Sequence, residues 1–216
     1  MDADRTVVVV AGGGRLDIEP NRLTAPFAVI AADGGAAEAH RLGLRVDLLV
    51  GDLDSATSAD VDAVGSSGGT IRRHPTDKDA SDLELALDEA MALGPRRIVV
   101  LAPAEGRFDF VLANALVLAS PRFGAVEIDA RFRSADVHVI GRERTLVGTP
   151  GDIVSLLAIG GPARGVRTEG LRWKLDGEDL LPGSSRGVSN EFVANEATIG
   201  LDGGVLFAVR PGPAIS

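Results

Sequence analysis

Four short, almost uninterrupted apolar runs in the first half of the chain restrict the folds that it can adopt. A strand with apolar side chains on both faces must be covered on both faces, as in the parallel sheets of α/β proteins. The runs are TVVVVAG (6–12), FAVIAA (27–32), VDLLVG (46–51) and RIVVLAP (97–103). Helical patterns come between or after them, at GAAEAHRLG (35–43), SDLELALDEAMALG (81–94) and RFDFVLANALVLAS (107–120). The alternation predicts an α/β domain with a mostly parallel sheet.

The segment at 81–94 carries the clearest helix signals. Ser81 and Glu84 match the capping box S-x-x-E, and Gly94 followed by Pro95 is typical of a helix end. Apolar residues recur at helical spacing, at Leu83, Leu87, Ala90 and Met91. We therefore expect this helix to pack one face on the sheet.

After about residue 124 the pattern changes to strands alone. Seven short runs are separated by Gly, Pro, Asp or Asn turns: EIDARF, DVHVIG, GDIVSLLAIG, RGVRTEGLRWKL, RGVSNEFV, EATIGL and GGVLFAVR. We expect an α/β N-terminal domain over 1–124, followed by an all-β sandwich C-terminal domain over 125–216.

Composition excludes several classes of function. A net charge of −9 argues against a protein that binds nucleic-acid backbones, and 4% aromatic residues argue against stacking on single strands. The chain has no run of about 20 apolar residues, and the acidic N-terminus is unlike a secretory signal, so we expect a cytoplasmic protein without a membrane partner. Because the chain has no cysteine, any metal must be held by oxygen atoms or by the three histidines.

Polar residues gather where the predicted strands end. The segments concerned are AGGG (11–14), DGG (33–35), GDLDS (51–55), PTDKDASD (75–82) and AEGRFDF (104–110). In open parallel sheets, ligands bind beyond the carboxyl ends of the strands. We therefore expect these segments to form one site.

Simpler explanations stay open for several of these residues. The run AGGG matches no phosphate-binding spacing, so an ordinary turn explains it equally well. Asp33 before two glycines fits a turn, and Asp82 after the Ser81 cap fits the helix dipole. The histidines match no metal-ligand spacing and are interpreted as structural or surface residues, at His40, His74 and His138.

The pair Asp52 and Asp54 favours a metal site. Side chains two residues apart on an extended segment point the same way, so with Asp79 they offer an all-oxygen, anionic site of the kind that Mg²⁺ prefers beside substrate phosphates. Lys78 and Arg107 can supply the positive charge that phosphoryl transfer needs.

Six motifs resemble those of the thiamine pyrophosphokinase family in order and spacing, over nearly the whole chain. The motifs are ADGG (32–35), LRVDLLVGDLDS (44–55), HPTDKDASDLELAL (74–87), GRFDFVLAN (106–114), LRWKL (171–175) and VSNEF (188–192). The resemblance implies a homodimer with active sites between the subunits. It also implies transfer of a diphosphoryl group from ATP to the hydroxyethyl oxygen of thiamine, with Mg²⁺ bound and AMP released.

The resemblance also implies roles for individual residues. Mg²⁺ would be held by Asp52, Asp54 and Asp79, with Asp33 completing the acidic cluster. The ATP and phosphate site would include Lys78, Asp82, Arg107, Asp109 and Asn114. Thiamine would contact Trp173, Ser189 and Asn190, with the indole stacked on an aromatic ring. From the residues alone, Trp173 is more simply a core residue. Within the reaction that the resemblance implies, Asp33 or Asp82 is a candidate to accept the hydroxyl proton.

Two residues depart from the family pattern within one motif. Phe110 replaces the usual His, and Glu105 replaces the usual Gly. These changes favour, as an alternative, a diphosphokinase that acts on another small alcohol such as a pterin. A non-catalytic protein that binds the nucleotide or thiamine is a second alternative, although the retained acidic residues argue against it.

Overall fold

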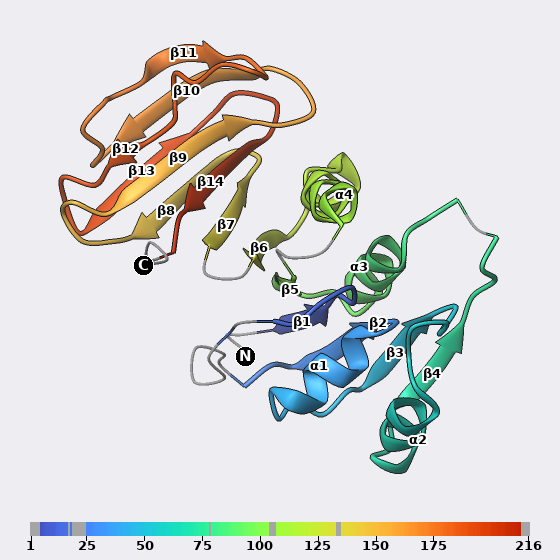
Figure 1. Ribbon diagram of the computed structural model, residues 1–216. Coiled ribbons are helices and arrows are strands. Elements are labelled where there is room, and N and C mark those ends of the chain that lie inside the picture. The colour runs from blue at the N-terminus through green and yellow to red at the C-terminus, as the bar shows by residue number, and fades with distance from the viewer. Residues whose placement is uncertain are drawn as a thin grey trace. The chain divides into compact units, whose positions relative to one another are not determined.

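The computed structural model describes residues 5–16, 18, 25–77, 79–103, 107–132 and 135–212. The chain divides into two compact units (Figure 1). Their bounds are Met1–Val117 with Val126–Arg133, and Leu118–Ala125 with Ser134–Ser216. A single cut after residue 124 was expected, but the chain returns to the first unit for one more strand.

A parallel sheet forms the centre of the first unit, with strand order β4-β3-β2-β1-β5-β6. The strands are β1 Thr6–Val10, β2 Ala28–Ala32, β3 Leu48–Gly51, β4 Thr70–Arg73, β5 Arg97–Ala102 and β6 Glu127–Phe132. Every residue of β1 and β2 is buried, as their continuous apolar runs predict. The α/β class with a parallel sheet is therefore confirmed.

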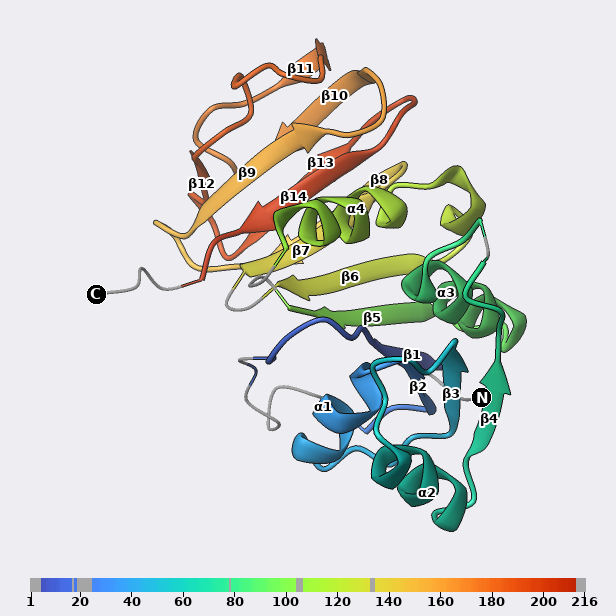
Figure 2. The same ribbon diagram turned by 45° about the vertical axis from the view of Figure 1, so that its right-hand side comes forward.

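Helices cover both faces of this sheet (Figure 2). They are α1 Gly35–Arg41, α2 Ser58–Ser66, α3 Asp82–Ala92 and α4 Phe108–Leu118. Leu42, after α1, and Val64 of α2 share a core with Val8 of β1. On the other face, α3 packs against β1, β2 and β3. Of the predicted apolar stripe of α3, Leu83, Leu87 and Ala90 are buried, as is Ala86, while Met91 is only partly buried.

The second unit is a sandwich of two antiparallel sheets, β12-β9-β14-β7 and β11-β10-β13-β8. The strands are β7 Ala135–Ile140, β8 Glu143–Val147, β9 Ile153–Ala158, β10 Ala163–Glu169, β11 Asp176–Leu180, β12 Asn190–Glu191, β13 Glu196–Gly200 and β14 Leu206–Arg210. A short 3₁₀ helix, η2, spans Pro121–Phe123. Side chains from both sheets, such as Leu156 and Ile199, meet in one core. The predicted all-β class is confirmed.

The run RGVRTEGLRWKL was expected to be one strand and is instead two segments. Strand β10 ends at Glu169, and Gly170 follows with φ +75. A Cβ on Gly170 would lie 2.1 Å from the Glu196 carbonyl oxygen, so only glycine fits this turn. Within the described residues, the structure has no helix long and apolar enough to cross a membrane.

Candidate active site

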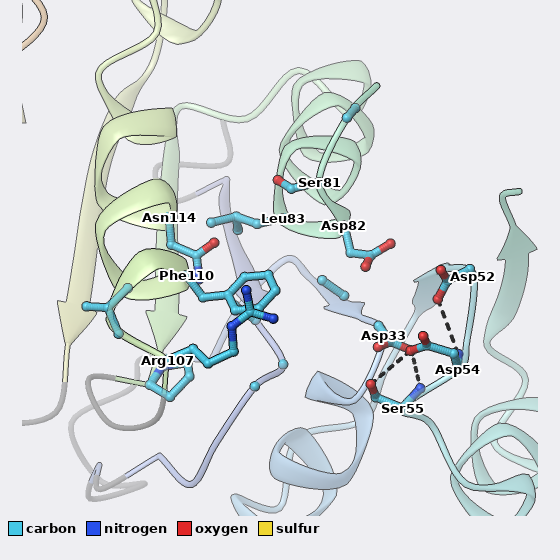
Figure 3. A pocket seen from close by; sticks show the side chains of 17 residues that line it. Asp33, Asp52, Asp54, Ser55, Ser81, Asp82, Leu83, Arg107, Phe110 and Asn114 are labelled. Carbon is cyan, nitrogen blue, oxygen red and sulfur yellow. Dashed lines mark hydrogen bonds between the residues drawn. The ribbon is translucent and has the colours of Figure 1, made fainter. Parts of the chain in front are cut away.

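A pocket of about 460 Å³ opens at the carboxyl ends of β1, β2, β3 and β5 (Figure 3). Its walls come from the loops after these strands, from the start of α3 and from α4. The chain crosses from one side of β1 to the other between β4 and β5, and ligands bind beside such a change of direction in open α/β sheets. The strand ends singled out in the sequence therefore converge as expected.

Three aspartates meet on one side of the pocket. Asp33 follows β2, Asp52 follows β3, and Asp82 is the first residue of α3. Each offers a carboxylate oxygen, and these oxygens lie within 4.8 Å of one another. Three carboxylates at this spacing repel one another unless a cation compensates them, and hard divalent cations prefer such oxygen ligands.

Gly51 allows the aspartates to approach one another. It ends β3 with φ +145, a conformation that residues with side chains rarely adopt. A Cβ at this position would lie 3.0 Å from Asp82 Oδ1 and 3.2 Å from the Asp33 Cβ. A side chain here would therefore enter the space between the two carboxylates.

Asp33 is held in a strained and buried position. Its φ is +46, its side chain is buried, and its backbone N–H donates to the Val50 carbonyl at 2.9 Å. Burial raises the pKa of Asp33, and the negative charge of Asp82 raises it further, while hydrogen bonds from Ser55 and Gly34 oppose the rise. The Ser55 N–H contact to Asp33 Oδ1 measures 3.4 Å.

The structure groups the aspartates differently from the metal set Asp52, Asp54 and Asp79 that we expected. Leu53 has φ +65, so the D-L-D segment is not extended, and of its two aspartates only Asp52 joins Asp33 and Asp82. Asp54 lines the pocket, but it is exposed, its N–H donates to Asp52 Oδ1 at 3.2 Å, and its carboxylate accepts from Ser55 Oγ at 2.9 Å. Asp79 is exposed and neither joins the aspartate group nor lines this pocket.

Lys78 falls outside the described residues, and so does Glu105. Their predicted roles stay predictions.

The opposite wall of the pocket carries Arg107, Phe110 and Asn114 (Figure 3). Arg107 forms a two-pronged ion pair with Asp109, at 3.2 Å from Nε to Oδ1 and 2.6 Å from Nη2 to Oδ2. This hydrogen-bonded pair raises the pKa of Arg107 and lowers that of Asp109. The guanidinium also lies 4.3 Å from the centre of the Phe110 ring. Asp109 thus acts on the pocket through Arg107, since it does not line the cavity itself.

The residues expected to contact thiamine lie in the second unit and do not line this pocket. Trp173 is 49% exposed, so the interpretation as a core residue is wrong. Ser189 has φ +57, and Asn190 is only 3% exposed.

Two contributors to the pocket were missed from the sequence. Ser55 donates to Asp33 and to Asp54, and Gly51 provides the space between Asp33 and Asp82. Both flank the aspartates in GDLDS, so their place in the chain was the available signal. The stacking of Arg107 on Phe110 has i, i+3 spacing at a helix start, and it was also available.

An acidic group facing an arginine, at the carboxyl edge of a parallel sheet, is typical of enzymes that transfer phosphoryl groups with a divalent cation. The family model described as thiamin pyrophosphokinase, catalytic domain, matches residues 21–129, and the one described as thiamin pyrophosphokinase, vitamin B1 binding domain, matches residues 137–206. The chain belongs to the thiamine pyrophosphokinase family, whose enzymes are ATP-dependent diphosphotransferases that convert thiamine to thiamine diphosphate.

Individual relatives agree with this membership. The chain is 23% identical to the thiamine pyrophosphokinase of Bacillus subtilis (strain 168) over 218 residues, which cover 95% of this chain and 98% of the relative. It is 27% identical to thiamine pyrophosphokinase 1 of Oryza sativa subsp. japonica over 173 residues, which cover 74% of this chain and 63% of the relative.

Solved structures share the fold. The crystal structure of the thiamine pyrophosphokinase from Bacillus subtilis matches with a TM-score of 0.84 at 22% identity, covering 97% of this chain and 100% of that chain. The structure of thiamin pyrophosphokinase from Candida albicans matches with a TM-score of 0.75 at 14% identity, covering 96% of this chain and 89% of that chain. Both matches span the two units described above.

Proposed function

We propose that the pocket of the first unit binds ATP with Mg²⁺ and that this chain carries out the family's reaction there. In that reaction the hydroxyethyl oxygen of thiamine attacks the β-phosphorus of ATP, a P–O bond forms to thiamine, and the bond to the leaving AMP breaks. The observation that carries the proposal is the convergence of Asp33, Asp52 and Asp82 on one side of the pocket.

The three aspartates fit a divalent cation. Their oxygens share one small space, and Gly51 leaves room between two of them. Burial, and to a smaller extent the negative charge of Asp82, raises the pKa of Asp33, and a bound cation would offset both effects. We therefore assign Asp33, Asp52 and Asp82 to the ion, with Asp54 beside them on the pocket wall. When bound, Mg²⁺ would supply positive charge to the phosphate oxygens of ATP.

Arg107 and Asn114 are proposed to bind ATP from the opposite wall. Asp109 and the Phe110 ring hold the Arg107 guanidinium in place, so less side-chain freedom is lost when the guanidinium meets a phosphate. Lys78 keeps its predicted role of offsetting charge on the leaving group. Asp33 and Asp82 both stay candidates for accepting the hydroxyl proton, through a carboxylate oxygen that does not bind the ion.

We further propose that the protein is a homodimer with the complete site at the subunit interface. Helix α4 exposes three large apolar side chains, Phe108, Leu112 and Leu116, which are 76%, 46% and 47% exposed. An apolar helix face of this kind supports contact with a second copy. A monomer in sedimentation at working concentration would contradict the proposal. The use of ATP supports our prediction of a cytoplasmic location, which cell fractionation would test.

Incubation of the protein with ATP, Mg²⁺ and thiamine tests the proposed function. We expect thiamine diphosphate and AMP in equal amounts, and no product when EDTA removes the cation. AMP formed only with another small alcohol, such as a pterin, would instead support the alternative acceptor, to which Phe110 on the pocket wall gives some support. Thiamine or ATP bound tightly without turnover would identify a binding protein and refute the enzyme.

A further inference from the structure

The only tryptophan of the chain lies in a segment without regular secondary structure of its own. Trp173 sits between β10 and β11, in a stretch of bends that starts after Gly170. Its side chain is half exposed. A large aromatic side chain in such a segment keeps one orientation only if neighbouring segments hold its backbone.

Asn190 holds that backbone with its side-chain amide. Asn190 Oδ1 accepts from the Trp173 N–H at 3.0 Å, and Asn190 Nδ2 donates to the Trp173 carbonyl at 2.8 Å. The same oxygen accepts from the Glu191 N–H at 2.9 Å. Both lone pairs of the amide oxygen are therefore used within the protein, and the side chain is buried. The amide takes the place that a neighbouring strand would have in a sheet.

The rest of strand β12 reinforces this hold. The Arg172 N–H donates to the Glu191 carbonyl at 2.9 Å, and the Arg172 guanidinium pairs with the Glu191 carboxylate at 3.1 Å. That guanidinium lies 5.3 Å from the centre of the Trp173 ring. A cation thus lies over one face of the indole, and the stacking proposed below would use the other face.

Strand β12 is itself fixed to the sandwich. Asn190 pairs with Val154 of β9, and the Ser189 N–H donates to Ser155 Oγ at 3.0 Å. Ser189 keeps a left-handed conformation at φ +57, which costs free energy for a residue with a side chain. This strained residue directly precedes Asn190, whose side-chain amide binds the Trp173 backbone.

We propose that Asn190 is a positioning residue: it holds Trp173 so that the indole stacks on the aromatic ring of the acceptor alcohol, and it does not bind that acceptor itself. The inference rests on the proposed function, in which thiamine is the acceptor. It differs from the direct thiamine contact that the resemblance suggested for Asn190. Direct contact is disfavoured because the Asn190 side chain is only 3% exposed, its Oδ1 already accepts two hydrogen bonds, and its Nδ2 already donates one.

Intrinsic fluorescence tests the proposal because Trp173 is the sole tryptophan. In Asn190→Ala we expect emission at longer wavelength and stronger quenching by acrylamide, since the indole is no longer held. The KM for thiamine should rise at least about tenfold, and the KM for ATP should stay unchanged. Asn195→Ala is the matched control, because this exposed asparagine of the same unit should alter neither fluorescence nor KM.

A double-mutant cycle separates positioning from direct contact. If Asn190 acts only through the indole, Asn190→Ala adds no further rise in thiamine KM to a Trp173→Ala variant. Additive effects, or a raised KM with unchanged fluorescence, would overturn the proposal. If Asn190→Ala fails to fold, Asn190→Ser must show the same two changes in smaller size. Should the parent make no thiamine diphosphate, the proposed function fails, while the fluorescence comparison still tests whether Asn190 holds Trp173.

Discussion

Asp33 combines a left-handed backbone conformation with a buried carboxylate. Each of these features costs free energy. Such residues persist where the surrounding structure holds them in place, and they cluster at active and binding sites. Aspartate and asparagine tolerate this backbone region better than most residues. The position therefore selects a short side chain, and the proposed cation explains why that side chain is an acid.

The raised pKa of Asp33 predicts how stability depends on pH. In the absence of Mg²⁺, the folded protein keeps the Asp33 proton to higher pH than the unfolded chain, whose ordinary value is 3.8. The Asp33 contribution to the free energy of unfolding is fully present below that value and is lost as pH rises through the folded pKa. Asn cannot lose a proton, so the stability of Asp33→Asn relative to the parent should increase with pH.

Urea unfolding of both proteins in EDTA, from about pH 4 to about pH 7, measures this difference. If the free energy of unfolding of Asp33→Asn minus that of the parent stays constant or falls as pH rises, burial does not raise the Asp33 pKa.

The chemistry of the site was visible in the sequence, but its grouping was not. The sequence placed Asp52 and Asp82 at strand ends that meet at one edge, as α/β sheets require. It could not show that Leu53 has a left-handed conformation, or that Asp82 and not Asp54 joins Asp33 and Asp52. Loop dihedrals depend on tertiary contacts, so an argument from extended spacing fails in such a loop.

At the scale of elements, α2 shows how a helix can form with little apolar patterning. Only Val64 of this helix is buried. Thr57 accepts from the Asp60 N–H at 3.2 Å, and the Asp60 carboxylate accepts from the Thr57 N–H at 3.1 Å, which completes a reciprocal cap. The sequence analysis missed α2 because it relied on apolar periodicity, whereas the T-x-x-D pattern was the usable signal.

Removal of this cap should weaken the first unit without affecting the site. We expect Thr57→Ala to lower the free energy of unfolding by about 1 kcal/mol, because the Asp60 N–H loses its acceptor, Thr57 Oγ1, and the Asp60 carboxylate loses the hydroxyl as a donor. Thr57→Ser keeps the hydroxyl and should retain most of that stability. Denaturant unfolding of the three proteins measures the effect, and equal losses in the Ala and Ser variants would rule out the cap as its source.

Strand β6 shows a second limit of sequence patterns. EIDARF alternates apolar and polar residues, so we placed it in the β-sandwich, yet it pairs in parallel with β5. Its inward polar residue, Asp129, is 5% exposed and accepts a hydrogen bond from Arg97 Nε of β5 at 2.6 Å. Strands β8 and β11 were also missed, whereas three of the four helices and most of the other strands fall on predicted segments in the predicted order. Long-range ion pairs of this kind are invisible in local periodicity.

At the scale of the whole molecule, the two units carry different parts of the proposed chemistry. The first holds the aspartate group and Arg107, and the second holds Trp173 with its supporting asparagine. The family models divide the chain in a similar way, into a catalytic and a vitamin B1 binding domain. Diphosphoryl transfer therefore depends first on whether the aspartate group binds the cation that ATP needs.

The Mg²⁺ dependence of turnover in Asp82→Asn and Asp79→Asn tests that requirement most directly. The two aspartates share one motif, but only Asp82 joins Asp33 and Asp52 at the pocket. We expect Asp82→Asn to raise the Mg²⁺ concentration for half-maximal turnover at least about tenfold, or to abolish turnover, because a ligand of the ion is lost. Asp79→Asn should leave it unchanged. The opposite result, with Asp79→Asn impaired and Asp82→Asn normal, would contradict the metal site proposed from the structure.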